Sequence, residues 1–147
     1  MVSSNPLKVV VDTNVWISGL LSRTGPPALL TRKVVQGGQA VFTAETFAEL
    51  KERLWRPKFD RYVTIEQRKK LLSDIESSAL WVEVPSTMAT TTYCRDAADD
   101  MFIHAALTAQ TTWLVSGDDD LLCLHPLGTL QILSPRDALN ALERSLQ

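Results

Sequence analysis

The sequence contains few of the residues on which many enzyme classes depend. Its 147 residues include only two cysteines and two histidines. Cys94 and Cys123 lie far apart and form no CxxC pattern, so both are expected to be ordinary thiols in a reducing compartment. His104 and His125 are isolated from each other, which argues against a His-rich metal centre or a Cys–His hydrolase.

Long apolar runs and a targeting signal are also lacking. No apolar run approaches the roughly 20 residues that span a membrane, and the N-terminus lacks the basic start and apolar segment of a signal peptide. Hydrophobic residues make up 45% of the chain and charged residues 22%, which is typical of a soluble globular protein. We therefore expect a cytoplasmic protein of one domain, 1–147, with no membrane association.

A basic overall charge, the usual mark of a nucleic-acid-binding domain, is absent, because the net charge is -2. The charges are nevertheless unevenly distributed. Eight of the 15 basic residues fall between positions 51 and 70, whereas acidic residues gather at Asp96–Asp100 and at Asp118–Asp120. The chain therefore carries a basic patch and acidic clusters in different places.

Apolar segments with strand patterns alternate with segments of helical periodicity. The expected strands are 9–11, 39–43, 80–84, 112–116 and 129–133. The expected helices are 15–21, 27–36, 44–55, 64–78, 96–110, 121–124 and 135–146, and 85–92 is expected to be a Ser/Thr-rich loop. This alternation predicts an α/β fold with a parallel sheet covered on both faces.

Two strands of this sheet are expected to end in an acid. The run Val9–Val11 fits a strand buried on both faces, and Asp12 follows it directly. An acid is costly to bury, so Asp12 is expected at the carboxyl edge of the sheet, where open α/β sheets place their ligand sites. Asp118 follows strand 112–116 across the Ser116–Gly117 turn and is expected at the same edge.

A third acidic group, Asp96, Asp99 and Asp100, opens the alanine-rich helix. Asp99 shares a helical face with Phe102 and Ile103, so its side chain is expected to point toward the sheet. Asp96 also suits an N-cap, and Asp99 and Asp100 also suit the positive end of a helix.

Carboxylates gathered in this way repel one another and raise each other's pKa unless a cation neutralises them. Oxygen-rich sites suit Mg²⁺ or Mn²⁺, which hold phosphates and activate water for attack on a phosphodiester. The pattern therefore predicts metal-dependent phosphoryl chemistry without choosing a substrate. Helix 44–55 offers Glu45, Glu49 and Glu52, and periodicity does not choose among them.

Four motifs, in this order and spacing, resemble the PIN-domain family, and in particular the VapC toxins of toxin–antitoxin pairs. They are VVVDTNVWIS, AETFAELKERLWRPKF, CRDAADDMFIHAA and WLVSGDDDLL. The resemblance covers about residues 8 to 135 and implies a single-domain α/β/α sandwich with a central, mainly parallel sheet of about five strands. It also implies an Mg²⁺- or Mn²⁺-dependent ribonuclease that acts on RNA, has a cognate antitoxin partner and forms a homodimer or higher oligomer.

Motif by motif, the resemblance implies catalytic and metal-binding roles for Asp12 in DTN, Glu49 in AEL, Asp99 in DAADD and Asp118 in SGD. The VapC-like branch usually reads DPDDNKF at the third motif. Ala97 and Ala98 replace its proline and acid here, so Asp100 stays an alternative ligand to Asp99. The supporting polar residues are expected to be Asn14, Ser116 and Asp96.

The basic segment 51–70 is the expected path for RNA. Its phosphate contacts are expected from Arg53, Arg56, Lys58 and Arg61, and its stacking contacts from Trp55, Phe59 and Tyr62. The alternative is a solvated helical hairpin whose aromatic residues belong to the core or to an interface.

Two other classes of function compete with the nuclease. In a binding module that acts by docking to an antitoxin or to itself, the exposed interface residues would be Trp16, Leu20, Leu21 and Trp55. A phosphatase or receiver-like domain needs a lysine on a late strand. No lysine follows Lys70, which argues against that class.

Overall fold

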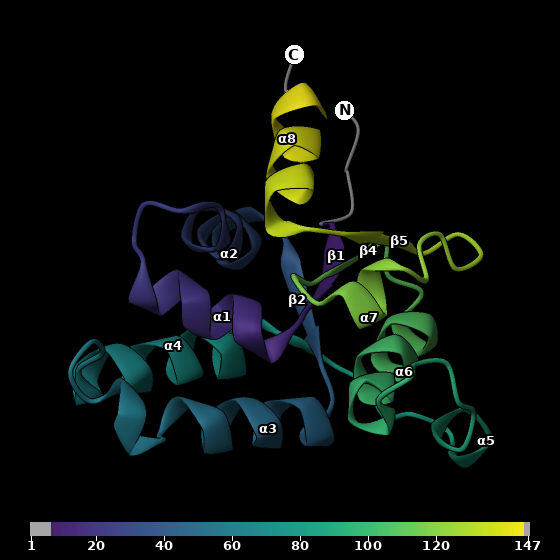
Figure 1. The fold of residues 1–147 in the computed structure, drawn as a ribbon, viewed down its shortest axis with the longest axis horizontal. Coiled ribbons are helices and arrows are strands. Elements are labelled where there is room, and N and C mark those ends of the chain that lie inside the picture. Colours follow the sequence, from purple (N-terminus) through teal and green to yellow (C-terminus); the bar gives the residue numbers. More distant parts are fainter. Residues whose placement is uncertain (1–6, 146–147) are drawn as a thin grey trace.

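A sheet of parallel strands runs through the centre of the computed structural model, which describes residues 7–145 (Figure 1). The strands are β1 (Lys8–Val11), β2 (Gln39–Phe42), β3 (Leu80–Trp81), β4 (Trp113–Val115) and β5 (Gln131–Leu133). Their order is β3-β2-β1-β4-β5, and every neighbouring pair is parallel. The predicted α/β sandwich with a five-stranded, mainly parallel sheet is confirmed, and the sheet is parallel throughout.

Helices connect the strands. They are α1 (Thr13–Leu21), α2 (Pro26–Gly37), α3 (Ala44–Leu54), α4 (Ile65–Ser78), α5 (Ser86–Ala89), α6 (Asp100–Ala109), α7 (Asp119–Leu122) and α8 (Pro135–Ser145). Short 3₁₀ turns lie at η1 (Pro57–Phe59) and η2 (Ala97–Asp99). Among residues 7–145, no helix has both the length and the apolar character needed to cross a membrane.

Both faces of the sheet are buried, which explains the unbroken apolar run of β1. Val9 and Val11 pack on one face with α1–α4 and α8, whereas Val10 packs on the other face with α6 and α7. Side chains of successive strand residues point to opposite faces, so a strand covered on both sides is apolar at every position.

Trp16 belongs to this core, and its prediction as an exposed interface residue is wrong. Its side chain is 1% exposed, and its ring lies 6.0 Å from that of Phe42. The reason is that α1 is packed between other helices, with contacts to both α2 and α3. Of the other predicted interface residues, Leu21 and Trp55 are exposed and Leu20 is partly buried.

The largest differences from the predicted elements lie in three segments. The strand expected at 80–84 has only two paired residues, because its partner β2 ends at Phe42, which pairs with Trp81. The loop expected at 85–92 contains α5. The helix expected to start at Asp96 begins at Asp100, because the Asp96 side chain accepts a hydrogen bond from the Ala98 backbone and closes the separate turn η2.

The strand order places a topological switch beside the centre of the sheet. From β1 the chain builds outward through β2 and β3 on one side, and β4 and β5 extend the sheet on the other side. Ligand sites in open α/β sheets lie at the carboxyl ends of the strands flanking such a switch. Here these ends are Asp12, which follows β1, and Ser116, which follows β4.

Candidate metal centre

Asp12 joins the end of β1 to the start of α1. Its carboxylate accepts a hydrogen bond from the Asn14 backbone at 3.3 Å and another from the Ser116 hydroxyl at 2.8 Å. The residue is only 4% exposed. Burial raises the pKa of Asp12, and the charges of Glu49 and Asp118 raise it further, while the two hydrogen bonds act in the opposite direction.

Ser116 links Asp12 to the second strand end. Its fully buried hydroxyl donates to Asp12 and accepts a hydrogen bond from the backbone of Asp118 at 3.0 Å. Asp118 in turn caps α7 by accepting from the backbone of Asp120 at 2.9 Å. The supporting residue predicted from the sequence therefore lies between two of the predicted acids.

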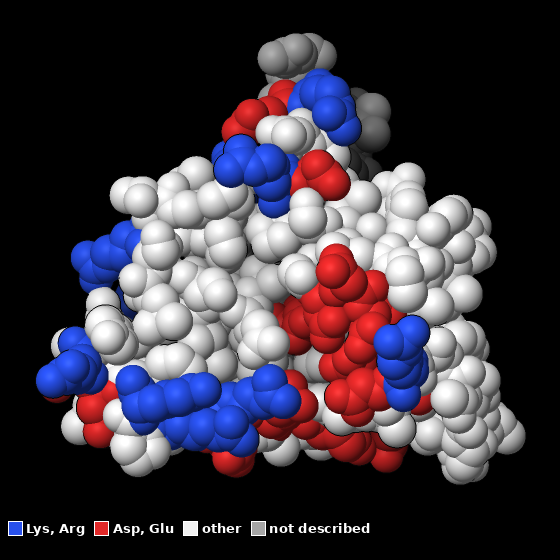
Figure 2. All heavy atoms as spheres, in the orientation of Figure 1, with Lys and Arg blue, Asp and Glu red and all other residues white. Residues whose placement is uncertain are grey.

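Asp99 and Asp118 face each other across the edge of the sheet. Together with Asp120 they offer carboxylate oxygens that all lie within 4.8 Å of one another. The pKa of Asp99 is raised to about 7. Burial is the largest cause, followed by the charges of Asp118, Asp12 and Asp96 and then by a hydrogen bond with Asp118. Figure 2 shows the acidic side chains of this region as one continuous surface.

Asp120 is the member of this cluster that was not predicted from the sequence. The Asp118–Asp120 hydrogen bond closes a tight turn, and this turn brings two carboxylates to the same side. The spacing of two residues at the start of a helix is the signal that indicates such a turn.

Asp100 has a different environment. It is 5% exposed, and its carboxylate accepts hydrogen bonds from the backbone of Tyr93 at 3.0 Å and of Cys94 at 2.7 Å. It thereby anchors the segment that leads into η2. The pKa of the Cys94 thiol is raised to about 12, mainly by burial and then by the hydrogen bond and the charge of Asp100. Asp99, and not Asp100, belongs to the carboxylate cluster among the described residues.

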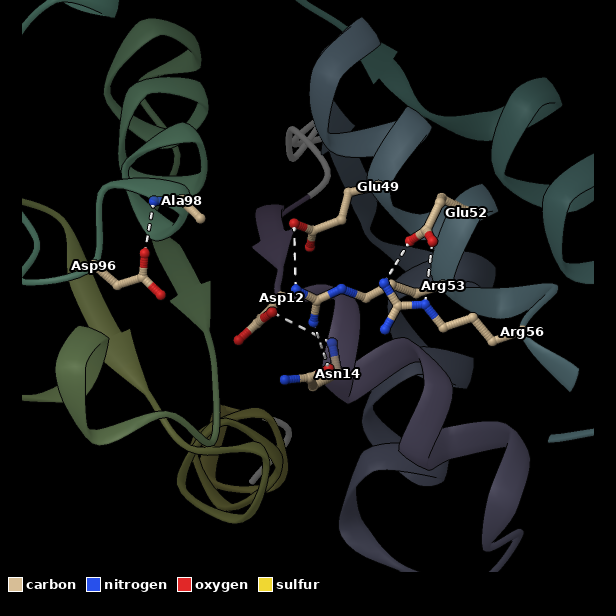
Figure 3. A network of polar contacts seen from close by, with 8 residues as sticks. All are labelled: Asp12, Asn14, Glu49, Glu52, Arg53, Arg56, Asp96 and Ala98. Carbon is tan, nitrogen blue, oxygen red and sulfur yellow. Dashed lines mark hydrogen bonds and ion pairs between the residues drawn. The ribbon is translucent and has the colours of Figure 1, made fainter. Parts of the chain in front are cut away.

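Glu49 reaches the edge of the sheet from α3. Reciprocal hydrogen bonds between Thr43 and Thr46 fix the start of this helix. The Glu49 side chain is 18% exposed and lies 3.7 Å from the Arg53 guanidinium, which also donates to the Asn14 side chain at 3.2 Å (Figure 3). Glu45 and Glu52 are exposed, so Glu49 is the acid of α3 that is turned toward Asp12.

Asp96 lies on the opposite side of the site from Glu49 (Figure 3). It is exposed, and its carboxylate accepts a hydrogen bond from the Ala98 backbone at 3.0 Å. The expectation of an N-cap at Asp96 is confirmed, although the cap belongs to η2. Its charge contributes to the raised pKa of Asp99.

The predicted RNA-binding residues divide into two groups. Arg53 is turned into the site, whereas Arg56 forms two hydrogen bonds with Glu52 at 3.1 and 2.9 Å. Lys58 lies over the ring of Phe59, and Arg61 is exposed. Figure 2 shows a basic band along α3 beside the acidic surface.

Of the aromatic residues in this segment, Tyr62 is 65% exposed and Trp55 is 38% exposed. Phe59 packs against the core. Trp55 also contacts the buried Arg68, whose guanidinium lies 5.3 Å from the indole centroid.

The donor set at this edge consists of oxygen atoms only. Neither histidine contributes, because His104 is hydrogen-bonded to the Thr91 carbonyl and His125 accepts from the Ile132 backbone. Hard divalent cations such as Mg²⁺ and Mn²⁺ prefer oxygen ligands, so the residues present fit such an ion.

The raised pKa of Asp99 predicts a pH-dependent stability for the metal-free protein. Folding favours the protonated carboxyl, so its stabilising effect is complete below the ordinary pKa of 3.8 and is lost as the pH rises through about 7. We expect the free energy of unfolding, measured in urea, to fall across this interval. Asp99→Asn should flatten the decline and Glu66→Gln, an exposed change on α4, should not. Equal slopes in both variants and the wild type would contradict this assignment.

The hydrogen bonds of Asp100 predict that it contributes more to stability than Asp99 does. Asp100→Ala leaves two backbone N–H groups without their acceptor and should lower the free energy of unfolding by roughly 3 kcal/mol. Asp99→Ala removes a group that is repelled by its neighbours and should leave the metal-free protein as stable or more stable. Urea unfolding of both variants at pH 7.5 tests this difference, and a larger loss for Asp99→Ala would refute it.

Sequence comparison identifies the family. The model described as PIN domain matches residues 8–120. The uncharacterized protein MJ1680 of Methanocaldococcus jannaschii is 30% identical to this chain over 121 residues, which cover 81% of this chain and 76% of the relative.

Solved structures share the fold at low sequence identity. A chain in the crystal structure of VapBC2 from Rickettsia felis, bound to a DNA fragment from its promoter, has a TM-score of 0.56 and 11% identity, and the match covers 87% of this chain and 98% of that one. PAE2754 from Pyrobaculum aerophilum has a TM-score of 0.58 and 15% identity over 95% of this chain and 96% of its own. With the matched region spanning β1 to α7, the chain belongs to the PIN-domain family.

Proposed function

We propose that this chain is a ribonuclease that uses Mg²⁺ or Mn²⁺ to hydrolyse RNA phosphodiester bonds and that it is the toxin of a toxin–antitoxin pair. The observation that carries the proposal is the facing pair Asp99 and Asp118, with Asp12 close enough to raise the pKa of Asp99 further. Holding like charges together is unfavourable unless a cation joins them. Membership of the PIN-domain family supports the same conclusion.

In this proposal Asp99, Asp118 and Asp12 hold the ion, with Glu49 as the fourth catalytic acid and Asp120 as an additional ligand. A divalent ion bound there would lower the pKa of a water molecule and offset the charge that develops on the phosphate. The chain's own contribution is to hold the ligands in position. Ser116 fixes the Asp12 carboxylate and the Asp118 backbone with one buried hydroxyl.

The basic band beside the site supports a path for the RNA backbone. Arg56, Lys58 and Arg61 are exposed on one segment and can contact phosphates, while exposed Tyr62 offers a ring on which a base can stack. Because the basic band lies next to the acidic site (Figure 2), a polyanion bound along the band would reach the site from a positively charged surface.

The toxin assignment includes a protein partner and self-association, in keeping with the structural likeness to VapBC2, which was crystallised on DNA from its promoter. Exposed apolar side chains on α1 and α2, Leu21 and Leu29, support such contacts. A PIN-fold module that acts only by binding is the competing function. RNA cleavage by the purified chain alone separates the two.

Asp12→Asn tests the nuclease directly. Its amide keeps the size of the side chain but removes a charged ligand, so RNA cleavage in Mg²⁺ or Mn²⁺ should fall to the level seen with EDTA, with an unchanged circular dichroism spectrum. Asp119→Asn, an exposed change next to the cluster, should cleave like the wild type. Metal-dependent cleavage by Asp12→Asn would exclude this site as the catalytic centre.

Charge reversal tests the RNA path. The double variant Arg56→Glu with Lys58→Glu should weaken RNA binding and reduce the slope of log affinity against log salt by about 1.4, since each lost phosphate contact on a single strand contributes about 0.7. The matched control is Arg32→Glu with Lys33→Glu on α2, which should leave the slope unchanged. Equal slopes in all three proteins would remove the guiding role from this segment.

A further inference from the structure

Arg53 differs from its basic neighbours in what it touches. Its guanidinium lies between the Glu49 carboxylate, at 3.7 Å, and the Asn14 side-chain oxygen, at 3.2 Å (Figure 3). Arg56, three residues later, points away from the site and pairs with Glu52 at 2.9 Å. Arg53 is thus the cation of the basic segment that enters the acidic edge.

The acidic edge has two halves with different charge balance. In the described part of the chain, Asp99, Asp118 and Asp120 form no ion pair with a lysine or arginine, and their oxygens are close enough to share one ion. Glu49, on the other half, already has a cation of its own in Arg53. The first half therefore lacks a counterion and the second does not.

We infer, on the basis of the proposed metal-dependent function, that Arg53 is the resident cation of the Glu49 half, so that this site binds one divalent ion, on the Asp99 half, rather than two. A second ion at Glu49 would have to displace the guanidinium from both of its partners. Arginine suits this role because it stays charged at any physiological pH and presents several N–H donors in a plane. The i,i+4 spacing on α3 holds it beside Glu49.

The same geometry gives Arg53 a role toward the substrate. Within the described part of the chain, its contacts with Glu49 and Asn14 leave other guanidinium N–H groups available to a phosphate that approaches from the basic band. Arg53 then supplies, from the protein, the positive charge that a second ion would supply in a two-metal site.

Manganese stoichiometry tests the inference on the full chain. Titration calorimetry should give one Mn²⁺ per chain for the wild type and two for Arg53→Met, which removes the charge but keeps an unbranched side chain. Electron paramagnetic resonance should show coupled ions in that variant and not in the wild type. Arg53→Gln should behave in the same way, and the double variant Arg53→Met with Glu49→Gln should return to one ion.

Two controls separate charge from position. Arg53→Lys keeps a cation at the site and should bind one ion, and Arg56→Met removes the same charge from the next paired position and should also bind one. Two ions in the wild type, or one in both Arg53→Met and Arg53→Gln, would overturn the inference and leave the nuclease proposal standing. No bound Mn²⁺ in the wild type would overturn both.

Discussion

The site depends on one buried hydroxyl. Ser116 donates to Asp12 at the end of β1 and accepts from the backbone of Asp118 after β4, so a single side chain joins the two strand ends at the topological switch of the sheet. Because both strands are buried on both faces, they have little freedom to move apart. The core therefore determines how closely Asp12 and Asp118 approach each other.

Bringing carboxylates together has a cost that the rest of the site is arranged to balance. The pKa of Asp99 is raised to about 7, first by burial and then by the charge of Asp118. On the opposite side, Arg53 neutralises Glu49 from within the chain. Among the described residues, Glu49 has an ion pair with an arginine, whereas Asp99, Asp118 and Asp120 have none, and it is beside these three that we propose that the ion binds.

The ends of β1 and β4 are predicted well because their signal is local: Asp12 and Ser116 each follow a short apolar run that fits a strand buried on both faces. Helical register predicts the direction of the Asp99 side chain, but it does not predict the turn η2 in which Asp99 lies. Glu49 follows from family resemblance alone, because three acids of α3 share its polar side. The position of Asp120 depends on a tight turn, and the inward direction of Arg53 depends on its rotamer; periodicity encodes neither. The burial of Trp16 depends on the packing of α1 between α2 and α3.

A crystal structure of the wild-type protein with Mn²⁺, located by its anomalous scattering, would test the proposal of a single ion on the Asp99 side of the site. We expect one anomalous peak at the carboxyl edge of the sheet, bonded to the carboxylates of Asp99 and Asp118, with the Arg53 guanidinium still between Glu49 and Asn14. A structure in millimolar Mn²⁺ with no anomalous peak at this edge, or with the ion held by Asp100 in place of Asp99, would contradict it.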